Sequence, residues 1–166
     1  MSVKINVDMK EEYMVDFMLR HTYRSVAGIA GLVIGIGAAM LAFSVVAKGD
    51  YQAAFPQILI AVLFLFVTPR NTIKRAQQQV QKSEMFQNTL EYEFSEEGVT
   101  VRQNGVESLT EWGEFYKAIE TQKSVILYVT RLRAIIFPKP CMGDQYQAVV
   151  NKIREHMPAA KVKIRG

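Results

Sequence analysis

The feature that most constrains this chain is a pair of apolar runs without a charged residue, at 25–47 and 51–69, separated by only three residues. A helix rises about 1.5 Å per residue, so the runs extend about 35 Å and about 28 Å, against about 30 Å for the hydrocarbon core of a bilayer. Lipid offers no hydrogen-bond partner to an open backbone, so both runs should be helical. The sequence therefore predicts a transmembrane hairpin. Its alternative, two core helices of a soluble protein, is disfavoured because such helices rarely stay uncharged for about 18 residues.

Basic residues near the ends of the runs predict the orientation of this hairpin. Lys10, Arg20 and Arg24 precede the first run, and four basic residues lie in the segment 70–88, whereas the turn has only Lys48, beside Asp50. Positive charge stays on the cytoplasmic side, so both termini should be cytoplasmic. The first run is too long, and the segment before it too polar, for a cleaved signal peptide. The segment 70–88 carries a net charge of +3, and three of its residues are candidates for contact with anionic headgroups: Arg70, Lys74 and Arg75.

Small residues recur at every fourth position of the first run, namely Ala27, Gly31, Gly35 and Ala39. Such a ridge lets two helix backbones approach closely. We expect Gly31 and Gly35 to pack on the bulky second helix of the same hairpin, since the motif is common, with a homodimer face as the alternative. Neither run contains the ionisable residues that line most transport pathways, so the hairpin is interpreted as an anchor. Pro56 is expected in the first turn of the second helix, where its missing N–H costs little.

The segment 89–166 has the pattern of an antiparallel β domain. Leu90, Tyr92 and Phe94 alternate with polar residues, and Asn104-Gly105 is a strong hairpin signal because both residues tolerate positive φ. The pattern predicts a meander of about six strands, then an amphipathic helix that Asp144 caps and Pro158 ends. A curved antiparallel sheet covered by a C-terminal helix is the architecture of pleckstrin-homology-like domains, an analogy at the level of the fold.

The predicted fold class is therefore an α+β membrane protein with four parts. The segment 1–24 supplies a cytoplasmic strand and helix, the strand being free to join the sheet. The segment 25–69 is the transmembrane hairpin, with spans 25–47 and 51–69. The segment 70–88 is a basic helical connector that extends the second helix, and 89–166 is the cytoplasmic β domain.

No catalytic, cofactor-binding or metal-binding residue is assigned from the sequence. Cys141 is the single cysteine, and the helix after it should keep His156 out of its reach, so a cysteine–histidine nucleophile is not expected. Three glutamates around Trp112 are interpreted as solvent-facing strand residues: Glu111, Glu114 and Glu120. Trp112 itself is expected to be a core residue, between the sheet and the C-terminal helix.

Three basic residues fall at predicted strand ends, Arg131, Arg133 and Lys139. They are candidates for contact with anionic lipid or a protein partner, against the alternative of ordinary solvated charges. The segment 89–166 has 11 basic and 10 acidic residues, a net charge of +1. This balance argues against nucleic-acid binding, which requires a clearly basic face.

Several short stretches of the β domain together resemble the YcxB-like family of bacterial membrane proteins. They are Tyr92-Glu93-Phe94-Ser95-Glu96-Glu97-Gly98-Val99, Glu111-Trp112, Ile119-Glu120-Thr121 and Ile135-Ile136-Phe137-Pro138-Lys139. Pro140-Cys141-Met142 departs from the basic and aromatic residues expected after Pro-Lys. The resemblance extends over nearly the whole chain and implies a bacterial plasma-membrane protein. It implies no established activity, so no catalytic residue is transferred.

Two functions follow as hypotheses. In the first, the chain is a membrane-anchored interaction or scaffold module whose β domain recruits a protein partner. In the second, it is an enzyme or regulator of lipid or envelope metabolism with a hidden cleft. A deep pocket with converging carboxylates or a histidine would favour the second, and a flat sheet with an exposed apolar edge would favour the first.

Overall fold

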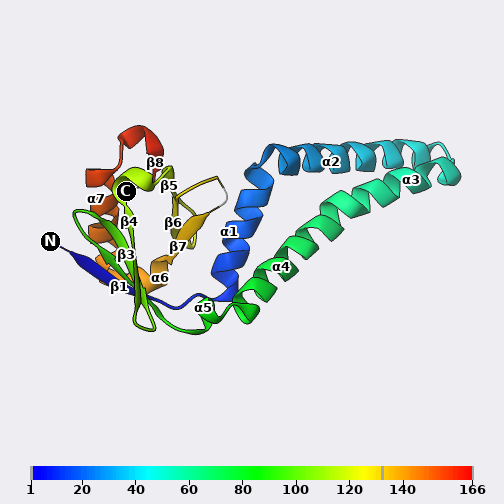
Figure 1. Ribbon diagram of the computed structural model, residues 1–166. Helices are drawn as coiled ribbons and strands as arrows, with labels where there is room; N and C mark the ends of the chain where they lie inside the picture. Colours follow the sequence, from blue (N-terminus) through cyan, green and yellow to red (C-terminus); the bar gives the residue numbers. More distant parts are fainter. Residues whose placement is uncertain (1, 132, 166) are drawn as a thin grey trace. The chain divides into compact units, whose positions relative to one another are not determined.

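The computed structural model describes residues 2–131 and 133–165, which form two compact units (Figure 1). One unit is Phe17–Gln78, and the other combines Met1–Asp16 with Gln79–Gly166. The first holds two apolar helices, and the second holds antiparallel sheets with a C-terminal helix. The α+β class is confirmed, and the start of the chain belongs to the same unit as the β domain.

The helical unit is built on a hairpin that begins after α1 (Glu11–Arg24). Helix α2 (Val26–Ala47) starts where the Ser25 side chain accepts a hydrogen bond from the Gly28 N–H at 3.0 Å. Gly49, at φ +82°, makes the turn, and Asp50 then caps α3 (Tyr51–Val62) by accepting from the Ala53 N–H at 3.0 Å. Helix α2 packs against α3, and α2 and the helical segment Tyr51–Lys82 are each long and apolar enough to span a membrane.

The second helix of the hairpin is continuous but irregular. After α3 it passes through a π-helical turn, η1 (Leu63–Val67), into α4 (Thr68–Lys82). The Leu63 carbonyl accepts both the N–H and, at 2.9 Å, the Oγ1 hydroxyl of Thr68. Pro69 follows directly and has no N–H to donate, which accounts for the wider turn at this point. Pro56 lies inside α3 rather than in its first turn, so the expectation for this residue is wrong: the helix already begins at Tyr51.

The first sheet has the order β1-β2-β3-β4 and is antiparallel throughout. Its strands are β1 (Val3–Val7), β2 (Leu90–Phe94), β3 (Gly98–Gln103) and β4 (Val106–Glu111). Asn104 at φ +51° and Gly105 at φ +79° form the predicted hairpin between β3 and β4. The N-terminal strand does join the sheet, as expected, with Val7 opposite Leu90.

The second sheet has the order β7-β6-β5-β8. Its strands are β5 (Lys117–Glu120), β6 (Ser124–Tyr128), β7 (Ala134–Pro138) and β8 (Val162–Lys163). Strand β8 pairs with β5 in parallel, so the predicted meander is divided into two sheets and gains a strand after the C-terminal helix.

Short helical elements connect and close the sheets. They are α5 (Glu84–Gln87), η2 (Trp112–Glu114), α6 (Lys139–Met142), η3 (Gly143–Gln145), α7 (Tyr146–His156) and η4 (Ala159–Lys161). Asp144 lies within η3 and does not cap α7, so that prediction is wrong. Gln145 precedes α7 in a helical conformation, whereas a side-chain cap normally needs an extended residue there.

Both sheets and α7 contribute to one core. Phe94 and Phe137 are fully buried, and their ring centroids lie 5.0 Å apart, which joins β2 to β7. Val149, Val150 and Ile153 of α7 are also fully buried. The predicted apolar stripe of this helix is therefore confirmed as the face that closes the β domain.

Candidate functional site

The outer surface of the α2–α3 hairpin is made of large apolar side chains. Val33, Phe43, Phe55 and Phe66 are 64 to 78% exposed, while the buried residues of α2 are glycine or alanine. Small residues turned inward bring the helices together, and bulky residues are left on the outside. In water such a surface would be a strong aggregation hazard, so its chemistry fits an apolar surrounding.

Gly31 and Gly35 lie at the contact between the two helices. A Cβ atom at Gly31 would come within 2.9 Å of Phe64 Cδ1, and one at Gly35 within 2.9 Å of Leu65 Cδ2. The buried stripe of α2 continues through Ala38 and Ala42 rather than through the predicted Ala39. A strict four-residue spacing drifts around a helix with about 3.6 residues per turn, so alternating steps of four and three hold the contact face.

The basic residues predicted as contact sites lie in three places. Arg70, Lys74 and Arg75 are exposed on α4, opposite the buried Ala76 and Val80. Arg131 and Arg133 are exposed in the connection between β6 and β7, just before β7 begins. Lys139 follows the other end of β7, six residues after Arg133, and a rise of about 3.3 Å per residue along the strand separates the two by about 20 Å. The structure therefore does not bring these three strand-end residues together.

Lys139 belongs instead to a polar cluster around Glu120. The Glu120 carboxylate lies 2.5 Å from Lys139 Nζ and accepts hydrogen bonds from the Tyr146 hydroxyl at 3.0 Å and the Arg165 N–H at 2.7 Å. Its side chain is 12% exposed, so the expectation of a solvent-facing glutamate is wrong for this residue. Burial raises the pKa of Glu120, but the three hydrogen bonds outweigh it and the pKa lies below its ordinary value.

Glu111 and Glu114 differ from Glu120 in that their side chains are exposed and accept hydrogen bonds from backbone N–H groups. They form a reciprocal capping box around the η2 turn, in which each side chain accepts a hydrogen bond from the other residue's N–H. The three glutamates therefore do not converge on one catalytic site.

A second polar cluster surrounds Trp112. The indole ring is buried, donates its Nε1–H to the Ser95 carbonyl at 3.0 Å, and stacks on the His156 ring with centroids 5.2 Å apart. His156 Nε2 lies 3.0 Å from one oxygen of Glu96, and Lys152 Nζ lies 2.5 Å from the other. The pKa of Glu96 is lowered to about 2, chiefly by the hydrogen bond from Lys152. The burial predicted for Trp112 is confirmed. The contacts of this cluster join α7 to the turn after β2.

Sequence reasoning did not identify the role of His156 or Lys152. They are four residues apart on α7 and so face the same side of the helix, which is a local signal. The residue they face, Glu96, is 56 positions from Lys152, and no local pattern marks that contact.

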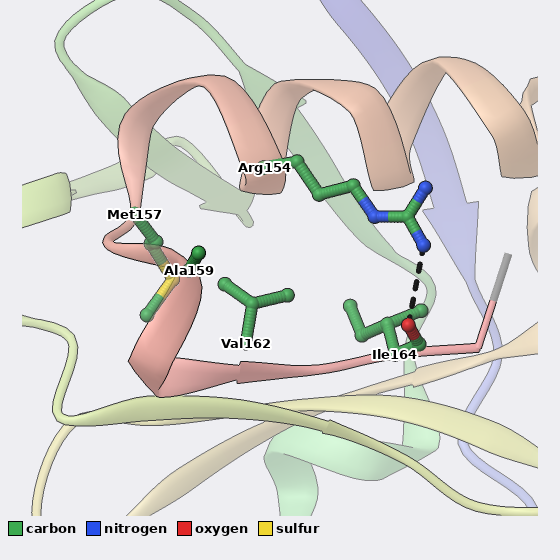
Figure 2. Close-up of a pocket in the computed structure, with 5 residues that line it drawn as sticks. All are labelled: Arg154, Met157, Ala159, Val162 and Ile164. Atoms are coloured by element: carbon green, nitrogen blue, oxygen red, sulfur yellow. Dashed lines mark hydrogen bonds between the residues drawn. The ribbon is translucent and has the colours of Figure 1, made fainter.

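Figure 2 shows a pocket between the end of α7 and the β8 segment, lined by Arg154, Met157, Ala159, Val162 and Ile164. Its volume is about 230 Å³, and the Arg154 Nη2 group already donates to the Ile164 carbonyl at 3.2 Å. Four of the five lining residues are apolar and none is an acid, a histidine or a nucleophile. Within residues 2–131 and 133–165, no group of three His, Cys, Asp or Glu side chains is placed to hold a metal ion.

The C-terminal part of this chain matches a known protein family. Residues 94–153, from the end of β2 into α7, match the family model described as YcxB-like protein. The match includes Trp112, Glu120 and Lys152, which belong to the two polar clusters. No curated protein and no solved structure matches the chain.

Proposed function

Since the C-terminal part of the chain carries a YcxB-like domain, we propose that this protein is an interaction module anchored in a bacterial plasma membrane. The observation that carries the proposal is the α2–α3 hairpin, whose interior is closed by glycine and alanine while its bulky apolar side chains face outward. Two such helices joined by a tight turn have the length and surface of a membrane anchor.

The distribution of charge supports a cytoplasmic position for the β domain. Arg20 and Arg24 precede α2, and Arg70, Lys74 and Arg75 follow the apolar part of the second helix. Only Lys48 lies in the turn. Both termini of the chain then lie on the cytoplasmic side. The exposed cations of α4 are suited to anionic headgroups, each worth about 1 kcal/mol near a membrane surface.

The chemistry of the β domain supports binding rather than catalysis. Glu120 and Glu96 are the most strongly engaged carboxylates described above, and both are neutralised by lysines in contacts that hold α6 and α7 in place. Their depressed pKa values keep them charged at neutral pH, which suits a structural ion pair better than a general acid. Two sheets closed by a C-terminal helix also support the pleckstrin-homology-like analogy, and domains of that kind commonly present a surface to partners.

The experiment that tests the anchor is a pair of reporter fusions in a bacterial membrane. A reporter that is active only in the cytoplasm should be active after Gly166, and a reporter active only in the periplasm should be active when inserted at Gly49. Gly49 is a suitable insertion point, because no heavy atom lies within 4 Å of a Cβ placed there. Periplasmic activity after Gly166, or release of the protein by alkaline carbonate, would contradict the proposal.

A further inference from the structure

Strand β4 is an outer strand of the first sheet, and among residues 2–131 and 133–165 no strand pairs with the backbone groups of its free edge. Gln103 and Val106 close a two-residue hairpin, so they are a hydrogen-bonded pair, and Ser108 and Thr110 continue the ladder with β3. The N–H and C=O groups of the residues between them, Glu107 and Leu109, therefore point away from the sheet. The Glu111 N–H points the same way, and the Glu114 carboxylate accepts it at 3.4 Å.

Most side chains of β4 are exposed to solvent. Val106 is 71% exposed and Leu109 43% exposed, and only Thr110 is half-buried. Proteins usually protect a free edge with charged side chains, above all lysine, with proline or with a very short strand. Strand β4 has six residues and contains neither lysine nor proline, whereas β8 has two residues and β7 ends in Pro138. Strand β1, at the other side of the same sheet, contacts α6.

One face of this edge has an alternating chemical pattern. Glu107, Leu109 and Glu111 project on the same side of the strand, which gives acid, aliphatic and acid at every second position. Arg102 of β3 lies 3.0 Å from one oxygen of Glu107, which leaves the second oxygen for another cation. An added strand that complements this edge has a basic residue, an aliphatic residue and a basic residue at alternate positions.

We propose that the free edge of β4 binds an extended, basic segment of a cytoplasmic partner protein as a fifth strand of the sheet. Outward N–H and C=O groups of Glu107 and Leu109 supply the main-chain hydrogen bonds. The two glutamates pair with the partner's cations, and Leu109 packs against its aliphatic side chain. The inference deepens the proposed function, on which it rests, by naming the surface and the kind of partner.

A second copy of the chain is a poorer occupant of the same edge. In an antiparallel β4–β4 pair, placing Leu109 opposite itself places Glu107 opposite Glu111, and placing Glu107 opposite itself brings two like charges directly together. Two of the remaining registers set a glutamate opposite Leu109, and the last sets Glu111 opposite itself. Like charges across a strand pair are destabilising, so every register loses the complementarity that a basic strand gains.

The test uses the full chain in nanodiscs of neutral phosphatidylcholine and a fluorescent peptide, Thr-Lys-Thr-Val-Thr-Lys-Thr, followed by anisotropy. A peptide with glutamate in place of both lysines is the control. Leu109→Pro removes an outward N–H without removing a hydrogen bond to β3, and Leu109→Val keeps that N–H. We expect saturable binding of the lysine peptide that weakens by about tenfold or more in Leu109→Pro and by less than about threefold in Leu109→Val.

The folding of Leu109→Pro is checked by the emission of Trp112, which should match that of the original chain. If this variant does not fold, Glu107→Lys replaces it, and we expect it to weaken binding of the lysine peptide by about tenfold or more, because a lysine of β4 then faces a lysine of the peptide. Absence of saturable binding, equal binding by Leu109→Pro, or a dimer that Leu109→Pro dissociates would each overturn the inference. The reporter fusions test the anchor separately, so a chain that inserts correctly but binds no peptide refutes only the edge.

Discussion

Replacing Trp112 tests how the β domain is held together, because this side chain packs between Phe94 of β2 and His156 of α7. The ring is 7% exposed, stacks on His156, and lies 6.5 Å from Phe94 and 5.8 Å from Phe115 between ring centroids. Trp112→Ala removes all of these contacts and leaves the Ser95 carbonyl without its donor. Emptying a core site of this kind costs about 3–5 kcal/mol. A domain of this size is commonly stable by about 5–15 kcal/mol, so the variant should lose a large share of its stability.

Trp112→Phe is the matched control. It keeps an aromatic ring against His156 and loses the hydrogen bond to Ser95, which is worth about 1 kcal/mol, together with part of the packing. The expected order of stability is therefore the original chain, then Trp112→Phe, then Trp112→Ala. A surface position would instead give three nearly equal proteins.

The assay is hydrogen–deuterium exchange of the full chain in detergent, read on peptides from β2, β3 and α7. Trp112→Ala should raise exchange across all three, because they share one core, while α2 stays protected. In the original chain the emission of Trp112, the single tryptophan, should be blue-shifted. Emission typical of a solvent-exposed indole, together with unchanged exchange in Trp112→Ala, would refute the core assignment and make this residue a surface contact.

Two further predictions concern the hairpin and the cluster at Glu96. Gly35→Leu should lower the stability of the hairpin in detergent by about 1–3 kcal/mol, whereas Gly37→Leu, where a Cβ meets no atom within 4 Å, should leave the thermal unfolding curve unchanged. The folded-state pKa of Glu96 is lowered from 4.5 to about 2, chiefly by the hydrogen bond from Lys152, so this contact stabilises the fold above about pH 4.5 and is lost as the pH falls toward 2. Urea titrations of Glu96→Gln should match those of the original chain at pH 2 and show lower stability at pH 7, with a smaller difference in high salt.

Local sequence patterns were sufficient to predict the elements whose formation depends on residues close together in the sequence. The absence of charge marked both apolar helices, Asn104-Gly105 marked its hairpin, and helical spacing marked α7. Strand β8 could not be found in this way. Val162–Lys163 is two residues long, has no alternation of its own, and exists only because β5 offers an edge more than forty positions earlier.

The contacts of the polar clusters could not be predicted from local sequence patterns either. Glu120 is a charged residue at the end of a predicted strand, between Ile119 and Thr121, where a solvent-facing side chain is the ordinary expectation. Its three partners come from α6, α7 and the segment after β8, and their arrival converts an exposed position into a nearly buried one. A local sequence pattern shows which residues of a strand are apolar and which are charged. It does not show that a later segment of the chain packs over one face of the sheet.

The pairing of β1 with β2 links the fold of the β domain to the topology of the hairpin. The whole hairpin lies between these two strands in the sequence, yet Val7 is opposite Leu90, and the Thr89 hydroxyl donates to Asp8 at 2.6 Å just beyond the pair. The chain therefore leaves the sheet and returns to it at the same place. A single membrane crossing would put the two strands on opposite sides of the bilayer, so the sheet can form only if the number of crossings is even.

This argument predicts a disulfide between Asn6→Cys and Glu91→Cys, which are opposite each other in the register, when the chain is oxidised in membranes with Cys141 replaced by serine. Opposed residues of antiparallel strands have Cα atoms about 4.5–5.5 Å apart, within the range that a disulfide requires. Asn6→Cys with Leu109→Cys is the control, because β4 lies three strands from β1 and about 14 Å away. Efficient cross-linking of the first pair alone is expected. Failure of that pair in a membrane-inserted chain would show that the two strands lie on opposite sides, and would refute the hairpin.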